Sequence, residues 1–544
     1  MPEPKTPRGL RLVGQPRPPE PPQDERPEVR LDQDVGRNVD ALDDALGAAD
    51  RTLYHRARRL VSVLPAVNIP GVADETPVLR EMTAPSLLTH IARHVDCLKW
   101  VVDKEEKGSG EWKIAPAAHR TAVDPLLHQG HWRSIKPIRA IVESPSLRPD
   151  GTVLQVPGYD VASGLLYTPG ATFPAVPDAP TQDEAKAALW ELVNVFCDFP
   201  HLSAAHKMVP IAALLTILSR AAIDGPCPAF IFDATVRGSG KTLQGDVVHA
   251  IACGRRPPHS TLNEQEEERE KVIAGVALKG APVIFIDNVK GLFGGPMIEA
   301  ALTSSVVGFR LFGTQELMEM PWSAVMLVSG NNLQMTDDMM RRCLTSRLES
   351  PLEDPTTRTE FAHPELIAWA LKERPRLLVL ALTMLRSFIS HGSPDAGVGT
   401  IGEPYGAWCR LIAGTIAYCG GANVLECRPP RESGGLDDIT ALRALLEGWR
   451  RIDTTDSGMT AAQIVRSLAH QGEGPDSLED LREALETLAP PRGSRVDPRT
   501  LGYALRRHRG RWVGQVRLTS VTGHDKTQRW RVEQRQQALE PKPA

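Results

Sequence analysis

Three short apolar runs in the middle of the chain are bounded by polar or proline residues. They span residues 229–232, 283–286 and 324–328. Runs of this length between turn-forming residues are typical of strands that are buried on both faces. Apolar residues at the i, i+3, i+4 spacing predict helices at 182–199 and 206–223, before the first run, and at 241–251, after it. This alternation of helices and strands predicts an α/β core built on a parallel sheet.

A glycine-rich segment joins the first apolar run to the helix at 241–251. Its candidate binding residues are Thr235, Gly238, Ser239, Gly240, Lys241 and Thr242. A strand, a glycine-rich turn and a Lys-Thr pair that opens a helix form the layout of a phosphate-binding loop. We expect Lys241 to reach the β- and γ-phosphates of a nucleotide and the Thr242 hydroxyl to bind Mg²⁺. Thr235 stands where the usual motif has its first glycine, and the remaining glycines are expected to keep the turn permissive.

The second apolar run ends in an acid. Asp287 follows the run directly, and a buried strand of this kind delivers a carboxylate beside a bound Mg²⁺. Many related ATPases have a second acid at the next position, which polarises the attacking water, but this chain has Asn288 there. Glu267 and Glu268, in a stretch that is also typical of a solvated helix face, are alternative candidates for the catalytic base. The sequence therefore predicts a metal site at Asp287 and does not decide which residue is the catalytic base.

The third apolar run leads to Asn331, whose amide at a strand end can hold the attacking water. About ten residues further on, Arg341 and Arg342 are candidates for an arginine finger, because a planar guanidinium that is always charged neutralises phosphoryl oxygens. A lone Arg-Arg pair is otherwise ordinary surface charge. Before the third run, residues 309–320 have the character of a hairpin, and Arg310 lies near its start.

The C-terminal region has three helix-like stretches followed by two strand-like stretches. The helices are predicted at 460–470, 478–488 and 498–508, and the strands at 511–518 and 528–533. This is the element order of a winged-helix domain. Residues 490–535 contain twelve Lys or Arg against three acids, which is typical of a DNA-contacting surface, although a basic protein-docking face has the same composition. The candidate DNA contacts are Arg499, Arg506, Arg507, Arg509 and Arg529.

The remaining regions complete a chain of several domains. Residues 1–38 are rich in proline and charge and are expected to form a disordered arm. The other predicted parts are a mixed α+β domain at 40–175, the ATPase core at 182–355, a helical lid at 356–427, a linker at 428–438, the winged-helix-like domain at 440–535 and a tail at 536–544. The helices predicted in the lid span 363–372, 374–390 and 405–418.

Two local patterns stand out in the predicted mixed domain. A helix is expected at 87–100, and its His90, His94 and Cys97 lie at helical spacing. Such a set can hold a metal ion, but it more often forms a half-buried helix face, which is our interpretation here. A Pro-Asp-Gly turn at 149–151 predicts a hairpin. Its strands are expected at 138–142 and 152–156.

Composition excludes several classes of protein. The 544 residues carry a net charge of −4, so any surface that attracts nucleic acid must be local. Eight cysteines without a CxxC pair indicate neither a zinc ribbon nor a disulfide framework. The longest apolar stretch, 377–385, is far shorter than the ~20 residues that cross a bilayer. We therefore expect a cytoplasmic protein with no membrane partner.

From the phosphate-binding loop onward, the sequence resembles the helicase-like ATPases of phages and integrated mobile elements, in the superfamily 3 branch of AAA+-like proteins. The matching motifs are Gly-Ser-Gly-Lys-Thr at 238–242, Val-Ile-Phe-Ile-Asp-Asn at 283–288, Ser-Gly-Asn-Asn-Leu at 329–333 and Asp-Met-Met-Arg-Arg at 338–342. Similar segments also occur at 148–152, 157–160 and 361–366. The resemblance covers roughly residues 80–535. The family often carries a primase module ahead of the ATPase, and we find none in this sequence.

The resemblance implies a homo-oligomeric ring, expected to be a hexamer, that binds ATP and Mg²⁺ between subunits and unwinds duplex while it moves on single-stranded or forked DNA. The roles that it implies are phosphate and Mg²⁺ binding by Lys241 and Thr242, Mg²⁺ organisation by Asp287, water positioning by Asn331, and an arginine finger from a neighbouring subunit at Arg341 or Arg342. Arg310 would contact DNA in the pore, and a separate primase would supply primers.

Two other functions are compatible with the sequence. One is an ATP-dependent DNA-remodelling switch, such as a helicase loader, which hydrolyses ATP without processive unwinding. The other is a non-enzymatic DNA-binding replication initiator with a degenerate nucleotide site. Strand displacement on forked DNA separates the helicase from the switch, and ATP turnover separates both from the initiator.

Overall fold

The contacts within the computed structural model divide the chain into two compact units. The large unit contains Met1–Leu333 and Ser346–Val424, and the small unit contains Gln334–Thr345 and Leu425–Ala544. The structure describes residues 26–67, 76–103, 109–115, 119–236, 238–262, 265–290, 292–310, 317–350, 355–428, 436–453, 457–469, 478–489, 496–507, 509, 512–513, 516–522 and 527–534.

The large unit begins with a mixed domain of two three-stranded sheets and three helices. The sheets have the orders β1-β5-β6 and β2-β3-β4. The elements are β1 (Glu28–Leu31), α1 (Val35–Ala49), β2 (Leu53–Arg56), β3 (Arg59–Pro65), β4 (Pro77–Glu81), α2 (Ala84–His94), β5 (Asp96–Val102), β6 (Gly110–Ile114) and α3 (Arg120–His128). Leu42, Leu46, Leu87, Ile91 and Leu126, from the three helices, are fully buried in its core.

Two predictions for this domain are wrong in their extent. The disordered arm predicted at 1–38 is too long, because β1 and the start of α1 lie inside it. Val29 and Leu31 alternate with exposed residues and become buried where β1 pairs in parallel with β5. The helix predicted at 87–100 ends at His94, where a strand takes over because the β-branched and aromatic residues of β5 favour extended backbone.

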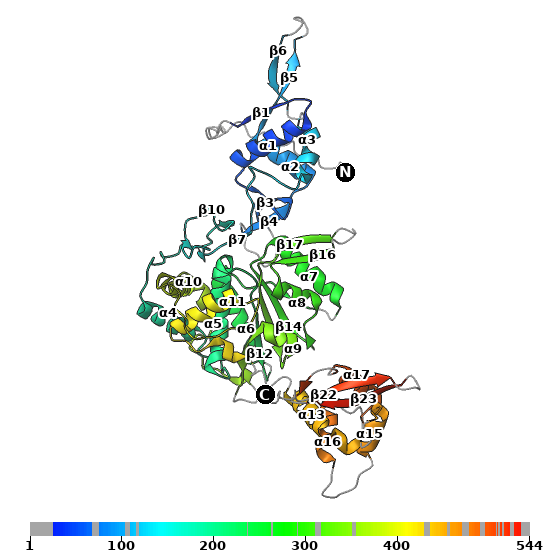
Figure 1. Ribbon diagram of the computed structural model, residues 1–544. Coiled ribbons are helices and arrows are strands. Elements are labelled where there is room, and N and C mark those ends of the chain that lie inside the picture. Colours follow the sequence, from blue (N-terminus) through cyan, green and yellow to red (C-terminus); the bar gives the residue numbers. More distant parts are fainter. Residues whose placement is uncertain are drawn as a thin grey trace, which may run out of the picture. The chain divides into compact units, whose positions relative to one another are not determined.

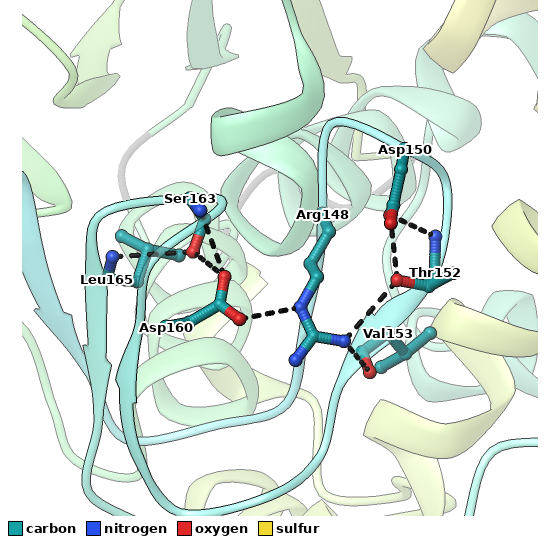
Figure 2. A network of polar contacts seen from close by, with 7 residues as sticks. All are labelled: Arg148, Asp150, Thr152, Val153, Asp160, Ser163 and Leu165. Atoms are coloured by element: carbon teal, nitrogen blue, oxygen red, sulfur yellow. Dashed lines mark hydrogen bonds and ion pairs between the residues drawn. The ribbon is translucent and has the colours of Figure 1, made fainter.

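A tight turn connects the antiparallel strands β8 (Ser146–Leu147) and β9 (Val153–Leu154), as Figure 2 shows. The other strands of this region are β7 (Ala140–Val142), β10 (Gly158–Asp160) and β11 (Leu165–Tyr167). The predicted turn is present, with Gly151 at a φ of 81°. Arg148 holds it by donating from Nε to Asp160 Oδ1 at 2.9 Å and from Nη1 to the Val153 carbonyl at 3.0 Å. The predicted pairing of the strand at 152–156 with the strand at 138–142 is wrong. β9 pairs with β8, while β7 pairs in parallel with β11.

A five-stranded sheet forms the centre of the large unit, in the order β13-β14-β18-β12-β20. Its strands are β12 (Ala229–Ala234), β13 (His259–Ser260), β14 (Val283–Val289), β18 (Val325–Asn331) and β20 (Cys343–Leu348). β12 and β14 both pair in parallel with β18, and β13 pairs in parallel with β14. The predicted mixed α/β fold with a parallel sheet is therefore confirmed. Because these strands are parallel, their carboxyl ends meet at one edge.

Helices lie on both sides of this sheet (Figure 1). The helices and the smaller strands of this region are α4 (Gln182–Val195), α5 (Ala204–Ser219), α6 (Lys241–Cys253), α7 (Glu266–Lys279), β15 (Leu292–Phe293), α8 (Pro296–Thr303), β16 (Val306–Arg310), β17 (Leu317–Pro321), α10 (Leu366–Ser390), α11 (Gly406–Trp408) and α12 (Gly414–Tyr418). α6 approaches the sheet closely at Gly245, where an added Cβ would lie 2.6 Å from Cζ of Phe285. The helices predicted at 182–199 and 206–223 are present as α4 and α5, which end a few residues earlier.

One long helix replaces the two helices predicted at 363–372 and 374–390. α10 continues through Pro375, although proline removes a helical hydrogen bond. The preceding Arg374 is buried and donates to the carbonyls of Ile251 at 3.0 Å and Ala252 at 3.4 Å, near the C-terminus of α6. These bonds anchor α10, which also packs against α4, in the large unit.

The small unit contains the three predicted helices, but the strand predicted at 511–518 is wrong, because its residues form two strands that pair antiparallel with each other. The predicted linker at 428–438 is too long, because a helix begins at Leu436. Its elements are β19 (Gln334–Met335), α9 (Asp337–Arg342), α13 (Leu436–Glu447), α14 (Trp449–Ile452), α15 (Ala461–Ala469), α16 (Glu479–Leu488), α17 (Pro498–Arg507), β21 (Trp512–Val513), β22 (Val516–Thr522) and β23 (Gln528–Gln534). Trp449, Leu481, Leu501 and Trp530 are buried in its core. Much of the predicted linker, 429–435, lies outside the described residues.

The eight cysteines are all free, and all except Cys197 are buried. Burial raises the pKa of the Cys97, Cys227 and Cys253 thiols to about 11, so these three are protonated at neutral pH. In the described part of the chain, no helix combines the length and the apolar character that a membrane crossing requires.

Candidate functional site

The glycine-rich loop lies between the end of β12 and the start of α6. Gly238 and Gly240 have φ angles of 79° and 89°, in the left-handed region that favours glycine. α6 begins at Lys241, and its N-cap residue is Gly240, which has no side chain that could cap the helix. The N–H groups of the first helical turn are therefore left without a cap from this residue and are suited to an anion.

Two polar residues of the loop have structural contacts. Thr235 is not among the residues with positive φ, so its backbone does not require glycine, and its N–H donates to the Leu348 carbonyl at 3.4 Å. Ser239 Oγ donates to the Val236 carbonyl at 2.8 Å and closes the turn. The departure from the usual motif at Thr235 is thus compatible with the loop geometry.

Three polar side chains meet at the carboxyl edge of the sheet. Thr242 Oγ1 donates to Asp287 Oδ1 at 2.9 Å, and Ser329 Oγ donates to the same oxygen at 2.5 Å. The two hydroxyl oxygens are 3.3 Å apart. The structure thus brings together the two residues that the sequence assigned to Mg²⁺, Thr242 and Asp287. Ser329, on β18 between β12 and β14, is a third member that the sequence analysis missed.

The environment of Asp287 favours its ionised form. Burial raises the pKa of this carboxyl, but hydrogen bonds from Ser329 and Thr242 and the charges of His259 and Lys241 outweigh burial and lower the pKa below its usual value. The carboxylate is therefore negatively charged at neutral pH, as a ligand for a divalent cation must be.

His259 connects this carboxylate to α6. Its Nδ1 lies 3.6 Å from Asp287 Oδ2, and its Nε2 lies 2.8 Å from Asp246 Oδ1. The ring packs edge-on against Phe285, with centroids 5.0 Å apart. His259 is thus placed to orient Asp287, and the isolated His-Ser pair in the sequence gave no signal of this.

Asn288 sits at an irregularity in β14. The register of β14 with β18 shifts between Ile286 and Val289, and Asn288 has a φ of 54°. Asparagine tolerates this left-handed conformation better than most residues. Its N–H donates to Ser329 Oγ at 3.0 Å, while the residue itself is exposed. The backbone geometry explains why asparagine is tolerated at this position.

The alternative candidates for the catalytic base, Glu267 and Glu268, lie on α7. Glu268 forms an ion pair with Lys271 at 2.6 Å on the same helix, α7, and Glu267 is exposed. Among the contacts of the described residues, none joins either acid to Asp287.

Asn331 ends β18 beside Ala234, the last residue of β12. Its Oδ1 is buried and has no hydrogen-bond partner within the described structure. A buried acceptor without a partner carries a free-energy cost, which a bound water or ligand would remove. This amide is therefore suited to the water-positioning role predicted for it.

A second ion pair braces the same edge of the sheet. Arg347, on β20, donates from Nη1 to Asp233 Oδ2 at 2.5 Å and from Nη2 to Asn332 Oδ1 at 3.0 Å. Asp233 is buried on β12, and burial raises the pKa of its carboxyl despite this partner. Asn332 has a φ of 45° and donates its N–H to the Ala234 carbonyl at 3.1 Å. These contacts fix the segment that carries Asn331.

The two candidate finger residues lie on the short helix α9 of the small unit. Arg341 forms an ion pair with Asp338 Oδ1, and Arg342 donates to Asp338 Oδ2 from Nε at 3.1 Å and Nη2 at 2.5 Å. The Arg341 side chain is 66% exposed and that of Arg342 20% exposed. In the single chain both arginines therefore bind an acid of their own helix, and Arg341 is the more accessible.

The hairpin predicted at 309–320 is present as the antiparallel pair β16 and β17. Arg310 is exposed at the end of β16, and its N–H donates to Glu270 Oε1 at 3.0 Å. The tip of the hairpin, 311–316, lies outside the described residues.

The basic residues of the small unit gather partly on α17. Arg499 and Arg506 are exposed, and between them Tyr503 is 67% exposed with the Arg506 guanidinium 5.0 Å from its ring centroid. These three residues have the i, i+4, i+7 spacing of one helix face. Arg509 is exposed and Arg529 lies on β23, whereas the side chain of Arg507 lies outside the described part. Tyr503 is a candidate contact that counting charges did not find.

Comparisons with known proteins give only distant likenesses. No family model matches the sequence, and no curated protein matches it. Among solved structures, the apo A form of the NrS-1 C-terminal region is 12% identical with a TM-score of 0.33, over 78% of this chain and 92% of that chain. The JCV helicase is 14% identical with a TM-score of 0.21, over 38% of this chain and 62% of that one. Likenesses of this strength carry no argument about this chain, and the site has to be interpreted from its own residues.

Proposed function

We propose that the chain is an ATP-dependent DNA helicase or translocase that acts in the replication of a phage or mobile element. One observation carries the proposal: the Thr242 hydroxyl and the ionised Asp287 carboxylate meet beside the N-terminus of α6, where Lys241 begins the helix. A helix N-terminus for phosphate, a lysine, and two oxygen ligands for a hard cation are together what a Mg²⁺–nucleotide complex needs.

The residues of this site fit both Mg²⁺ and the phosphates of ATP. Oxygen atoms from Thr242 and Asp287 suit Mg²⁺, which binds few protein ligands and keeps several waters. Lys241 and the N–H groups of the loop would hold the phosphates of ATP. When bound, Mg²⁺ would neutralise charge that develops on the phosphoryl oxygens.

The chain's own side chains would then set up hydrolysis. Ser329 and His259 orient Asp287 through the contacts at 2.5 and 3.6 Å. Asn331 offers its unpartnered Oδ1 to the attacking water. A neighbouring subunit of a ring would supply Arg341 or Arg342, which requires the arginine to exchange its Asp338 partner for a phosphate. On this proposal the ring is a homo-oligomer, and a hexamer is the expected size.

ATP turnover measured with and without single-stranded DNA tests the proposal, together with strand displacement on a forked substrate and sizing with a non-hydrolysable ATP analogue. We expect hydrolysis that DNA stimulates, unwinding that requires ATP, and assembly that requires the nucleotide. Hydrolysis without unwinding would favour a remodelling switch or loader. DNA binding without any hydrolysis would contradict the enzymatic proposal and favour an initiator.

Replacing Asn288 by aspartate tests whether this position faces the attacking water. Aspartate keeps a side chain that tolerates the φ of 54° and adds the missing carboxylate. We expect kcat for ATP to rise on the order of tenfold, less than the ~10²-fold of a well-placed general base. Asn332→Asp is a matched control, because Asn332 also has a positive φ, of 45°, but its Oδ1 is held by Arg347. An unchanged rate in Asn288→Asp would place the base elsewhere.

Removing charge from α17 tests the DNA-binding role of the small unit. The double variant Arg499→Gln/Arg506→Gln is expected to weaken binding to duplex DNA and to reduce the slope of log K against log salt by roughly 0.9 per lost phosphate contact. Arg443→Gln/Arg451→Gln makes the same charge change on α13 and α14 and should leave the slope unchanged. Equal slopes for the two double variants would mean that this face of α17 docks protein instead.

A further inference from the structure

A cluster of three metal-ligating side chains lies in the N-terminal mixed domain, outside the proposed nucleotide site. We propose that Asp50, His90 and His94 form a Zn²⁺ site that ties the end of α1 to the end of α2. One ligand atom from each residue lies within 4.8 Å of the other two. His90 Nδ1 is 2.5 Å and His94 Nε2 is 3.8 Å from Asp50 Oδ2.

The fold brings these residues together from two segments. His90 and His94 lie at i and i+4 near the end of α2, so their imidazoles share one helix face. Asp50 is the C-terminal cap of α1. Cys97, which the sequence placed on the same helix as the histidines, lies instead on β5, and its buried thiol belongs to the hydrophobic core.

The two oxygens of Asp50 have separate roles. Oδ1 accepts from the Thr52 N–H at 2.8 Å and from Thr52 Oγ1 at 2.6 Å. This leaves Oδ2 directed at the two imidazoles. A ligating carboxylate whose other oxygen is fixed by hydrogen bonds is a common feature of metal sites, because the outer partner sets the orientation of the ligand.

Charge also favours a cation here. The Asp50 side chain is 0% exposed, and a buried carboxylate requires a compensating positive charge. Within the described residues, the ion pairs of Asp50 are with His90 and His94 alone, so the three side chains face one another. A divalent cation between them would compensate the carboxylate, and two imidazoles with one carboxylate are ligands that zinc prefers.

The distances require only side-chain adjustment. Bonds of about 2 Å in a tetrahedral site place two ligand atoms roughly 3.3 Å apart. His90 would therefore turn away from Asp50 slightly and His94 would turn toward it. The His94 side chain is 34% exposed, so solvent can reach the cluster and supply a fourth ligand.

Metal titration of the full-length protein, purified with a chelator that is then removed, tests this site. We expect one Co²⁺ per chain to bind with the visible absorption of a tetrahedral site, Zn²⁺ to displace it, and Zn²⁺ to raise the melting temperature. His94→Ala should weaken this binding at least about 100-fold, and Thr52→Val about tenfold, within the range for a lost outer partner. His128→Ala, at an exposed histidine on α3 of the same domain, should have no effect.

The controls separate this proposal from a histidine–aspartate ion pair and from the nucleotide site. A parent protein that shows no saturable Co²⁺ binding, or the same affinity in the parent and His94→Ala, would overturn the proposal. Circular dichroism reports whether His94→Ala folds, and if it does not, Thr52→Val decides, with unchanged affinity counting against the site. ATP turnover is not needed for any of these measurements, so the outcome is independent of the proposed helicase function.

Discussion

Lys241→Ala is expected to reduce ATP hydrolysis to the background of the assay while the protein stays folded. Lys241 is the first residue of α6, at the end of the glycine loop, so alanine preserves the helix and removes the charged side chain. Loss of a single group that stabilises charge in a transition state costs ~10²–10³-fold. We expect a loss at least this large, because the lysine would also bind the ground-state phosphates. Phosphate release at saturating ATP and Mg²⁺ measures it.

A matched control makes this result specific. Lys372→Ala removes an exposed lysine from α10 in the same unit and should keep the parent rate. Melting temperatures of both variants should agree with that of the parent within a few degrees. A Lys241→Ala protein that hydrolyses ATP at the parent rate would show that the loop is not a phosphate-binding loop.

Local sequence patterns were sufficient for the parts of the fold that short-range physics determines. The buried strands are short apolar runs, and the loop before Lys241 carries the glycines that its left-handed φ angles require. The pairing of strands that are distant in the sequence was harder to predict than the strands themselves. β1 lies in a proline-rich stretch and is stabilised by β5, more than sixty residues later, which no local pattern reveals. α10 passes through Pro375 because Arg374 gains partners on α6.

The same distinction applies to the candidate site. Thr242 and Asp287 belong to motifs, so the sequence found them. Ser329 and His259 act through contacts with Asp287 that form only once distant segments are adjacent in the sheet. Ser329 stands in the Ser-Gly-Asn-Asn-Leu motif at 329–333, but that motif assigns the serine no role of its own, and a histidine after a proline pair is common.

The arginine pair gives the second large expected effect. Replacing the responsible arginine, Arg341 or Arg342, by alanine should preserve ATP binding and lower hydrolysis on the order of 10³-fold, the low end for arginine fingers. Each arginine now binds Asp338, so the side chain is already held near the end of α9 and needs only a new anionic partner. Single variants compared by nucleotide binding and by turnover identify which of the two acts.

Mixing variants tests whether that arginine acts on a neighbouring subunit. Lys241→Ala lacks the phosphate contact but keeps the arginine, and the arginine variant has the opposite defect. In a randomly mixed ring with one type of head-to-tail interface, about a quarter of the sites would combine an intact loop with an intact arginine, so partial activity should return. A mixture of Lys241→Ala with Asn331→Ala is the control, because both defects lie in the same half of the site and no intact site can form. If a label shows subunit exchange and the arginine mixture stays as inactive as this control, the arginines do not act between subunits, and the proposed ring loses its main support.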